Sequence, residues 1–267
     1  MAITTVDGAL AGFRPAEKIL KAVTGTLVAG RPHSLFYLAG IPGAAVAPTP
    51  GLSGAALTAY SGQIPVPSAS NNTHVARFRG ASSAQGGVLE LYDRLWHNSG
   101  FTITINTAQT VNSVTFPARD DDGSTNGSGV YLGVEVSAAT GAGVPTITVS
   151  YTNSAGTAGR TATNINATVA SSIAGTFYPI GLQAGDTGVR SVQTLTLSAT
   201  WTSGTIHLVA YRLISELCFP AAGIPDVTDA VTGALPRLYD NSVPFLVFTP
   251  QTTTTTQISS SLSFTQG

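Results

Sequence analysis

The stretch VYLGVEV, residues 130–136, decides the fold. Its apolar residues stand at every second position, and they are Val130, Leu132, Val134 and Val136. Alternation with a period of two, carried by β-branched and aromatic residues, is typical of a β-strand with one buried face. The stretch therefore predicts a strand rather than a helix.

Similar stretches lie on both sides of this one. We expect further strands over residues 88–96, 101–105, 111–116, 147–151, 194–201, 206–213 and 243–249. Clusters of Gly, Asn, Asp and Ser link them, and these residues favour turns. Short strands at this spacing predict an all-β protein, with an antiparallel β-sandwich or jelly-roll-like core. No stretch has the pattern of a βαβ crossover, so a parallel sheet is not expected.

The first 85 residues have a different texture, rich in Pro and Gly. We expect a short helix over residues 15–23, because Pro15 stands where a helix accepts proline. The remainder is apolar, with Leu35, Phe36 and Tyr37 in one run, so it is not a solvated linker. Either an extended arm lies on a partner, or a loop-rich segment folds over its own β core. Both interpretations stay open.

The last region also allows two interpretations. Residues 227–235 predict a second short helix, and a threonine-rich tail follows it. Ile258, Leu262 and Phe264 give this tail a weak apolar face. It either completes a sheet of its own chain or adds a strand to a neighbouring subunit. We therefore expect an anchoring region at residues 1–85, a β-sandwich core at 86–215 and a C-terminal segment at 216–267.

Charged residues are rare throughout the chain. There are 12 Lys and Arg and 13 Asp and Glu, or 9% of 267 residues, where about 25% is usual. A surface with so little charge favours association, which predicts a subunit of a larger assembly. The net charge of −1 offers no basic excess for nucleic acid. Neither a secretory signal nor a membrane-spanning run is recognised, so we expect synthesis in a cytoplasm. The single cysteine, Cys218, is expected to be buried.

An acidic loop is the best candidate for a metal site. Asp120, Asp122, Ser124 and Asn126 alternate with other residues as oxygen donors, as in calcium loops. The glycine and glutamate of an EF-hand are missing from their positions. A calcium site and a plain exposed turn both explain the loop. No other cofactor is expected.

Catalytic motifs are not found. G-x-S-x-G, H-E-x-x-H and the P-loop pattern are all missing, and the four histidines occur singly. We therefore do not expect an enzyme. Trp96 and Trp201, with several tyrosines, are either a sugar-binding platform or core and interface anchors. Arg77 and Arg79 lie two apart, on one strand face, where they either pair with an acidic partner or face solvent.

Longer stretches resemble a family of tailed-bacteriophage virion proteins. They are YDRLWHNSGF (residues 92–101), TAQTVNSVTFPAR (107–119), DGSTNGSGV (122–130), SYTNSAGTAGRTAT (150–163), LQAGDTGVRSVQTLTL (182–197) and PRLYDNSVPFLVF (236–248). The resemblance spans residues 92–250, somewhat over half of the chain. It implies a structural subunit of the virion, without deciding between head and tail, and it brings no catalytic residues.

From this resemblance we expect a capsid decoration or cement protein that binds the major capsid protein and stabilises the head. It would be made in the host cytoplasm and reside in the virion as a homo-oligomer, and the analogy with decoration proteins at three-fold positions suggests a trimer. The alternatives are a component of the tail, neck or baseplate, and a carbohydrate-binding module for host recognition. The residues expected at interfaces are Leu35, Phe36, Tyr37, Arg77, Arg79, Ile258 and Phe264.

Overall fold

The chain folds into antiparallel β-sheets packed as sandwiches, which confirms the predicted fold class. The computed structural model describes residues 3, 5–23, 25–68 and 71–267. Within these residues the only α-helix is α1 (Val6–Ala11), whose first turn is capped by the hydroxyl of Thr5. The contacts divide the chain into two compact units, each with its own core.

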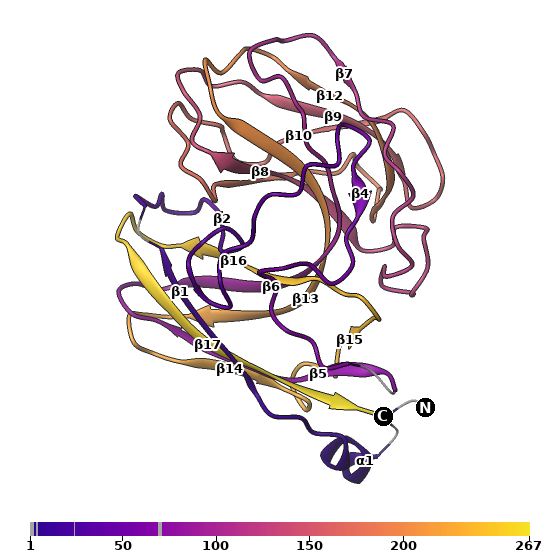
Figure 1. The fold of residues 1–267 in the computed structure, drawn as a ribbon, viewed down its shortest axis with the longest axis vertical. Coiled ribbons are helices and arrows are strands. Elements are labelled where there is room, and N and C mark those ends of the chain that lie inside the picture. Colours follow the sequence, from indigo (N-terminus) through magenta and orange to yellow (C-terminus); the bar gives the residue numbers. More distant parts are fainter. Residues whose placement is uncertain (1–2, 4, 24, 69–70) are drawn as a thin grey trace. The chain divides into compact units, whose positions relative to one another are not determined.

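The first unit comprises residues 1–46, 59–93 and 213–267. Its strands are β1 (Glu17–Val23), β2 (His33–Ser34), β3 (Gly40–Ile41), β5 (Thr73–Ser82), β14 (Asp226–Asp229), β15 (Arg237–Leu238), β16 (Pro244–Pro250) and β17 (Thr256–Gln266). One sheet has the order β14-β5-β17-β1-β3, so the last strand lies between two early ones (Figure 1). Ile258, Leu262 and Phe264 are buried beneath it. The tail thus completes a sheet of its own chain.

The second unit comprises residues 47–58 and 94–212. Its strands are β4 (Ala55–Ala56), β7 (Gln109–Thr110), β8 (Val130–Ala138), β9 (Ile147–Asn153), β10 (Arg160–Thr163), β11 (Phe177–Ile180) and β12 (Val189–Leu197). Two longer strands contribute residues to both units, and they are β6 (Gly87–His97) and β13 (Thr205–Phe219). The sheet β10-β9-β12-β7 and the strands β11, β8 and β13 enclose the core.

The deciding stretch lies in β8 and is more deeply buried than alternation implies. Its four apolar residues are fully buried, and so is Glu135, while Tyr131 is exposed. The ring of Phe177 occupies the space above Gly133, where a Cβ atom would lie 2.3 Å from it. Glycine is therefore required at this position so that β11 can pack against β8.

Two predicted helices are wrong. Residues 17–23 form β1, paired along its whole length with β17, and the buried positions are Ile19, Lys21 and Val23. Pairing with a long neighbour overrides the helix propensity of Leu, Lys and Ala. Residues 226–229 form β14 against β5, and a turn follows where residues 230–235 were expected to be helical.

Other local predictions also need correction. Residues 101–105 and 111–116 are irregular, although Phe101, Ile103 and Phe116 are buried in the core of the second unit. Their alternation reflects burial of single side chains by a loop rather than a strand. Cys218 is exposed, because it alternates with the buried Leu217 and Phe219 on β13.

The early loop-rich segment packs on its own chain. Leu27, Leu35, Phe36 and Ile64 are buried in the first unit. Residues 47–58 belong to the second unit, so the two units do not coincide with the expected ranges 1–85, 86–215 and 216–267. Six residues of the expected region 1–85 lie outside the described residues, and they are residues 1, 2, 4, 24, 69 and 70. Among the described residues, no helix has the length and apolarity needed to cross a membrane.

Candidate functional site

A row of polar side chains crosses the outer face of the sheet in the first unit. Lys18 of β1 lies opposite Ser261 of β17, which in turn lies opposite Arg79 of β5. Along β5 the exposed Arg77 and Arg79 alternate with buried neighbours. We call Lys18, Ser261 and Arg79 the basic row. It borders a shallow hollow of about 310 Å³ that Pro225 also lines.

An apolar groove adjoins the basic row. Helix α1 and the turn after β14 line it, and its volume is about 650 Å³, within the usual range for binding sites. Val6 is 76% exposed and Val231 is 91% exposed, and Leu10, Phe13 and Val227 are also exposed. The apolar groove is defined by these five residues. Apolar side chains gathered at one surface indicate an interaction site.

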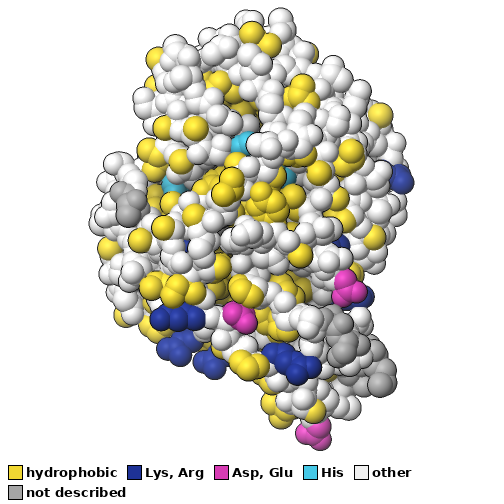
Figure 2. All heavy atoms as spheres, viewed as in Figure 1, with side chains coloured by type: hydrophobic (Ala, Val, Ile, Leu, Met, Phe, Trp, Pro, Cys, Tyr) yellow, Lys and Arg dark blue, Asp and Glu magenta, His cyan; other side chains and the backbone are white. Residues whose placement is uncertain are grey.

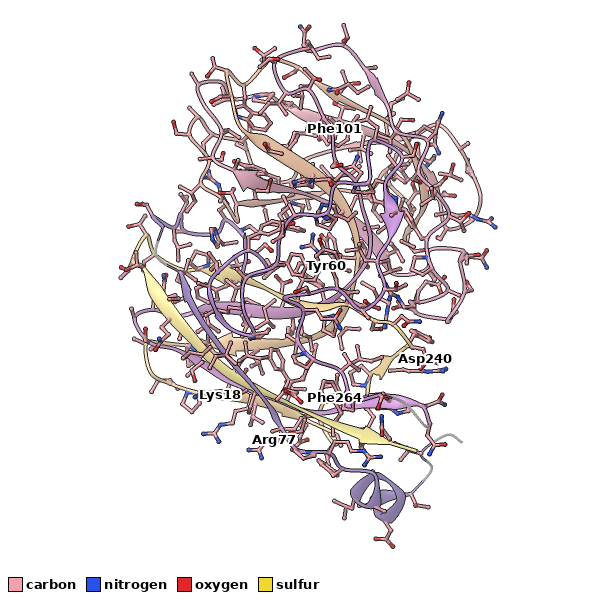
Figure 3. The ribbon with its side chains drawn as sticks, viewed as in Figure 1. Lys18, Tyr60, Arg77, Phe101, Asp240 and Phe264 are labelled. Carbon is pink, nitrogen blue, oxygen red and sulfur yellow. The ribbon has the colours of Figure 1, made fainter. Side chains whose placement is uncertain are left out.

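The groove and the row form one continuous surface. Val227 lines the groove and pairs in register with Arg79, while Arg77 also lines the groove. Figure 2 shows Lys and Arg side chains gathered among hydrophobic ones in the region where Figure 3 labels Lys18 and Arg77. Arg77 lies opposite Asp229 of β14 and helps to lower the pKa of that carboxyl, although the backbone amides of Thr232 and Val231 lower it more. We call the combined surface the docking face.

The structure places the expected interface residues in two groups. Leu35, Ile258 and Phe264 belong to the core of the first unit, and Phe36 is buried with its ring against that of Phe245. Arg77 and Arg79 are exposed on the docking face, and Tyr37 is half-buried. The spacing of the two arginines correctly places them on one exposed strand face, and their role at an interface stays a prediction. Sequence spacing does not predict Lys18, Ser261 or the groove residues beside them, because these come from distant parts of the chain.

The acidic loop is organised around one carboxylate. Asp120 is buried and accepts hydrogen bonds from the backbone N–H groups of Asp122, Ser124, Gly127 and Ser128, and from the Ser124 hydroxyl. Burial alone would raise the pKa of Asp120, but these hydrogen bonds hold it below its usual value. Asp122 and Asn126 are exposed. The turn interpretation accounts for all of these contacts, and the calcium interpretation stays a prediction.

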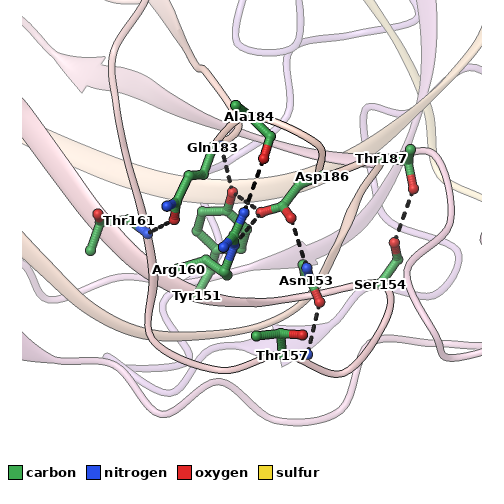
Figure 4. Close-up of polar contacts among 10 residues, drawn as sticks. All are labelled: Tyr151, Asn153, Ser154, Thr157, Arg160, Thr161, Gln183, Ala184, Asp186 and Thr187. Carbon is green, nitrogen blue, oxygen red and sulfur yellow. Dashed lines mark hydrogen bonds and ion pairs between the residues drawn. The ribbon is translucent and has the colours of Figure 1, made fainter.

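Two of the family-like stretches meet around Asp186 (Figure 4). Its carboxylate accepts hydrogen bonds from Arg160 Nε at 2.9 Å, Tyr151 Oη at 2.6 Å and Asn153 Nδ2 at 2.7 Å. Arg160 is the main cause that lowers the pKa of Asp186 to about 2. Asn153 also accepts from the backbone N–H of Thr157. The conspicuous polar residues of SYTNSAGTAGRTAT thus fix a hairpin loop to the 183–188 segment.

A buried polar cluster links three strands of the second unit. Arg94 of β6 donates two hydrogen bonds of 2.7 Å to Glu135 of β8, and both side chains are 0% exposed. Arg94 Nη1 also lies 3.0 Å from His97 Nδ1, and the rings of His97 and His207 are 4.6 Å apart. Burial, and then the charge of Arg94, keep the pKa of His97 well below its usual value. Burial also lowers the pKa of His207, so His97 and His207 are neutral members of an internal network.

One pair in this cluster has the geometry of an activated serine. Ser137 Oγ lies 2.7 Å from His207 Nε2, and His207 Nδ1 lies 2.8 Å from the carbonyl oxygen of Asn98. A carbonyl only accepts, so Nδ1 carries the hydrogen and Nε2 accepts from the serine. No local sequence pattern predicts this pair, because Ser137 and His207 are far apart in the chain. The imidazole is 2% exposed, so a substrate has no direct route to it.

The aromatic platform does not form. Trp96 and Trp201 are fully buried, and each indole N–H donates to a backbone carbonyl, of Ser53 and Val169 respectively. Tyr151 and Tyr178 are fully buried as well, whereas Tyr131 is 38% exposed. The tryptophans are core residues, which removes the observation that suggested a carbohydrate-binding module.

Comparisons with known proteins add little. Neither the protein-family models nor the curated proteins contain a match to this chain. Similar solved structures include that of the infectious bursal disease virus Gt strain, with 9% identity, 96% of this chain and 81% of that chain covered, and a TM-score of 0.21. The VP2 subviral particle of the same virus is 8% identical, with 96% of this chain and 81% of that chain covered and a TM-score of 0.22. Superpositions this loose do not establish a common fold, and neither structure is of a tailed bacteriophage.

Proposed function

We propose that this chain is a structural subunit of a virus particle and that it attaches to the particle through the docking face. The observation that supports this proposal is that the apolar groove and the basic row form one continuous surface. The chain that bears this surface has only 9% charged residues. A large exposed apolar surface is typical of a site that a partner covers, and the cations beside it can pair with acidic groups of that partner. The resemblance of six stretches to virion proteins supports the same conclusion.

The finer proposal is a decoration or cement protein that binds the major capsid protein. Such a protein stabilises a shell because each copy adds binding free energy and the copies are many. A β-sandwich that presents the docking face to the shell could bind in this way. A tail or neck component would use the same face with fewer copies, so the number of copies separates these two possibilities.

The experiment is to measure the copy number in purified particles by quantitative mass spectrometry against the major shell protein. A ratio within a few-fold of the shell protein supports a decoration protein. A ratio below about one in twenty moves the chain to the tail or neck, since such parts have few copies by symmetry. Absence of the protein from particles would overturn the proposed function.

A further inference from the structure

We propose that the docking face binds an extended acidic segment of a partner protein, with an apolar side chain in the groove and a carboxylate on the basic row. This inference rests on the proposed function for the nature of the partner, which is another virion protein. It adds the chemistry that would recognise that partner.

The basic row can hold a carboxylate. Adjacent strands lie about 4.8 Å apart, so the Cα atoms of Lys18 and Arg79 are about 10 Å apart across β17. Both side chains are long enough to converge above Ser261, whose hydroxyl supplies a third donor. An arginine fork matches the two oxygens of a carboxylate. The hollow of about 310 Å³ leaves room for the group.

The row has no carboxylate from its own unit. Among the described residues, no ion pair involves Lys18 or Arg79, whereas Arg94 and Arg160 are both paired with acids. The two acids of β14 lie opposite other residues of β5: Asp229 lies opposite Arg77, and Asp226 lies opposite Gly80 and accepts a hydrogen bond from the backbone N–H of Cys218. The two cations of the row are therefore available to a partner.

The groove favours a protein over nucleic acid. Stable binding to nucleic acid uses many phosphate contacts, whereas this surface offers the three cations Lys18, Arg77 and Arg79. A phosphate backbone also has no apolar side chain to fill a groove of about 650 Å³. A peptide segment supplies both chemistries.

The register sets the spacing of that segment. From Val227 to Ser261 the sheet spans two strand intervals, or about 10 Å, which is about three residues of extended chain. The partner segment should therefore carry its acidic side chain about three residues from its apolar one.

The first test uses peptides as probes in low salt. The probe is Leu-Leu-Ser-Glu-Glu, compared with Leu-Leu-Ser-Lys-Lys, and binding to the full chain is measured by isothermal titration calorimetry. The wild type should bind the glutamate peptide at least tenfold more tightly than the lysine peptide. The Lys18→Glu/Arg79→Glu variant should reverse this preference, which a misfolded protein could not do.

Controls locate the effect. Arg190→Glu changes one exposed cation of the second unit and should leave the preference unchanged. Val231→Asp, in the groove, should lower the affinity for the glutamate peptide at least fivefold. Equal affinity for the two peptides, or tighter binding of a single-stranded oligonucleotide or of inorganic phosphate, would overturn the inference.

The second test uses particles. The Lys18→Glu/Arg79→Glu variant should fall at least tenfold in copies per particle, while Arg190→Glu should match the wild type. Wild-type protein in particles together with full incorporation of the double variant would sink this inference and leave the proposed function standing. Absence of the wild type from particles would instead remove the proposed function.

Discussion

In the second unit, charged side chains face one another: Arg94 meets Glu135 at 2.7 Å, and Arg160 meets Asp186 at 2.9 Å. In the first unit, Lys18 and Arg79 lie on an outer sheet face without an ion pair among the described residues. Removing one partner from either ion pair of the second unit should therefore damage the fold, whereas under the proposed function removing a charge from the docking face should damage binding.

The largest effect should come from Glu135→Ala. This change leaves the fully buried Arg94 without its carboxylate, and breaking a buried pair in this way costs about 3–5 kcal/mol. Both tryptophans lie in the second unit, so tryptophan fluorescence during urea unfolding follows that unit. The variant should show a much lower midpoint.

A matched control removes both charges of this pair. Arg94→Leu/Glu135→Leu leaves no uncompensated charge and should lose less stability than Glu135→Ala, although Arg94 also contacts His97. A loss below about 1 kcal/mol for Glu135→Ala would contradict the view that this pair holds the second unit.

A smaller loss is expected for Asp120→Ala. Four backbone N–H groups would lose their acceptor. One donor that stays unsatisfied costs about 1–3 kcal/mol, and we expect a total of this size because the loop is partly exposed and water can satisfy most of the four donors. Asp122→Ala, at an exposed position, should cost little and serves as the control. Differential scanning calorimetry measures both.

The same variants test the calcium hypothesis. If the loop binds calcium, millimolar calcium should raise the melting temperature of the wild type but not that of Asp120→Ala/Asp122→Ala. An unchanged wild-type melting temperature would remove the hypothesis. The hydrogen bonds that surround Asp120 already satisfy much of its carboxylate.

The strands that can be predicted from the sequence alone are those that pair with long neighbouring strands. The alternation in residues 130–136 and 147–151 and the apolar run in residues 243–249 place strands correctly, because the strands formed there pair with long partners. Residues 101–105 alternate as clearly but form no strand. Alternation reports which side chains are buried, and an irregular segment can bury them too.

Only part of the docking face can be predicted from the sequence. The spacing of Arg77 and Arg79 predicts a shared strand face, and β5 confirms it. Lys18 and Ser261 lie beside them because β17, near the end of the sequence, pairs with both β1 and β5, which lie in its first third. Local patterns carry no information about such distant pairing, and the misassigned helix at residues 15–23 hid Lys18 as well.

The stability that the Asp186–Arg160 pair gives to the second unit should depend on pH. Because the folded state lowers the pKa of Asp186 from 3.8 to about 2, the carboxylate adds stability above pH 3.8 and loses it as the pH falls towards 2. The stability of the wild type relative to Asp186→Asn should therefore shrink over this range. Urea midpoints from tryptophan fluorescence between pH 2 and pH 6 measure it, and a difference that is constant with pH would contradict the role of Arg160.

The smallest effect should come from Arg79→Gln. Its side chain is exposed and makes no ion pair among the described residues, so the free energy of unfolding should change by less than about 0.5 kcal/mol. Calorimetry of the whole chain is the suitable measurement, since tryptophan fluorescence reports on the second unit. Arg94→Gln is the matched change of a paired arginine and should cost several times more. If Arg79→Gln cost more than about 1 kcal/mol, Arg79 would be part of the fold, and the division between charges that build the protein and charges that bind its partner would fail at its central residue.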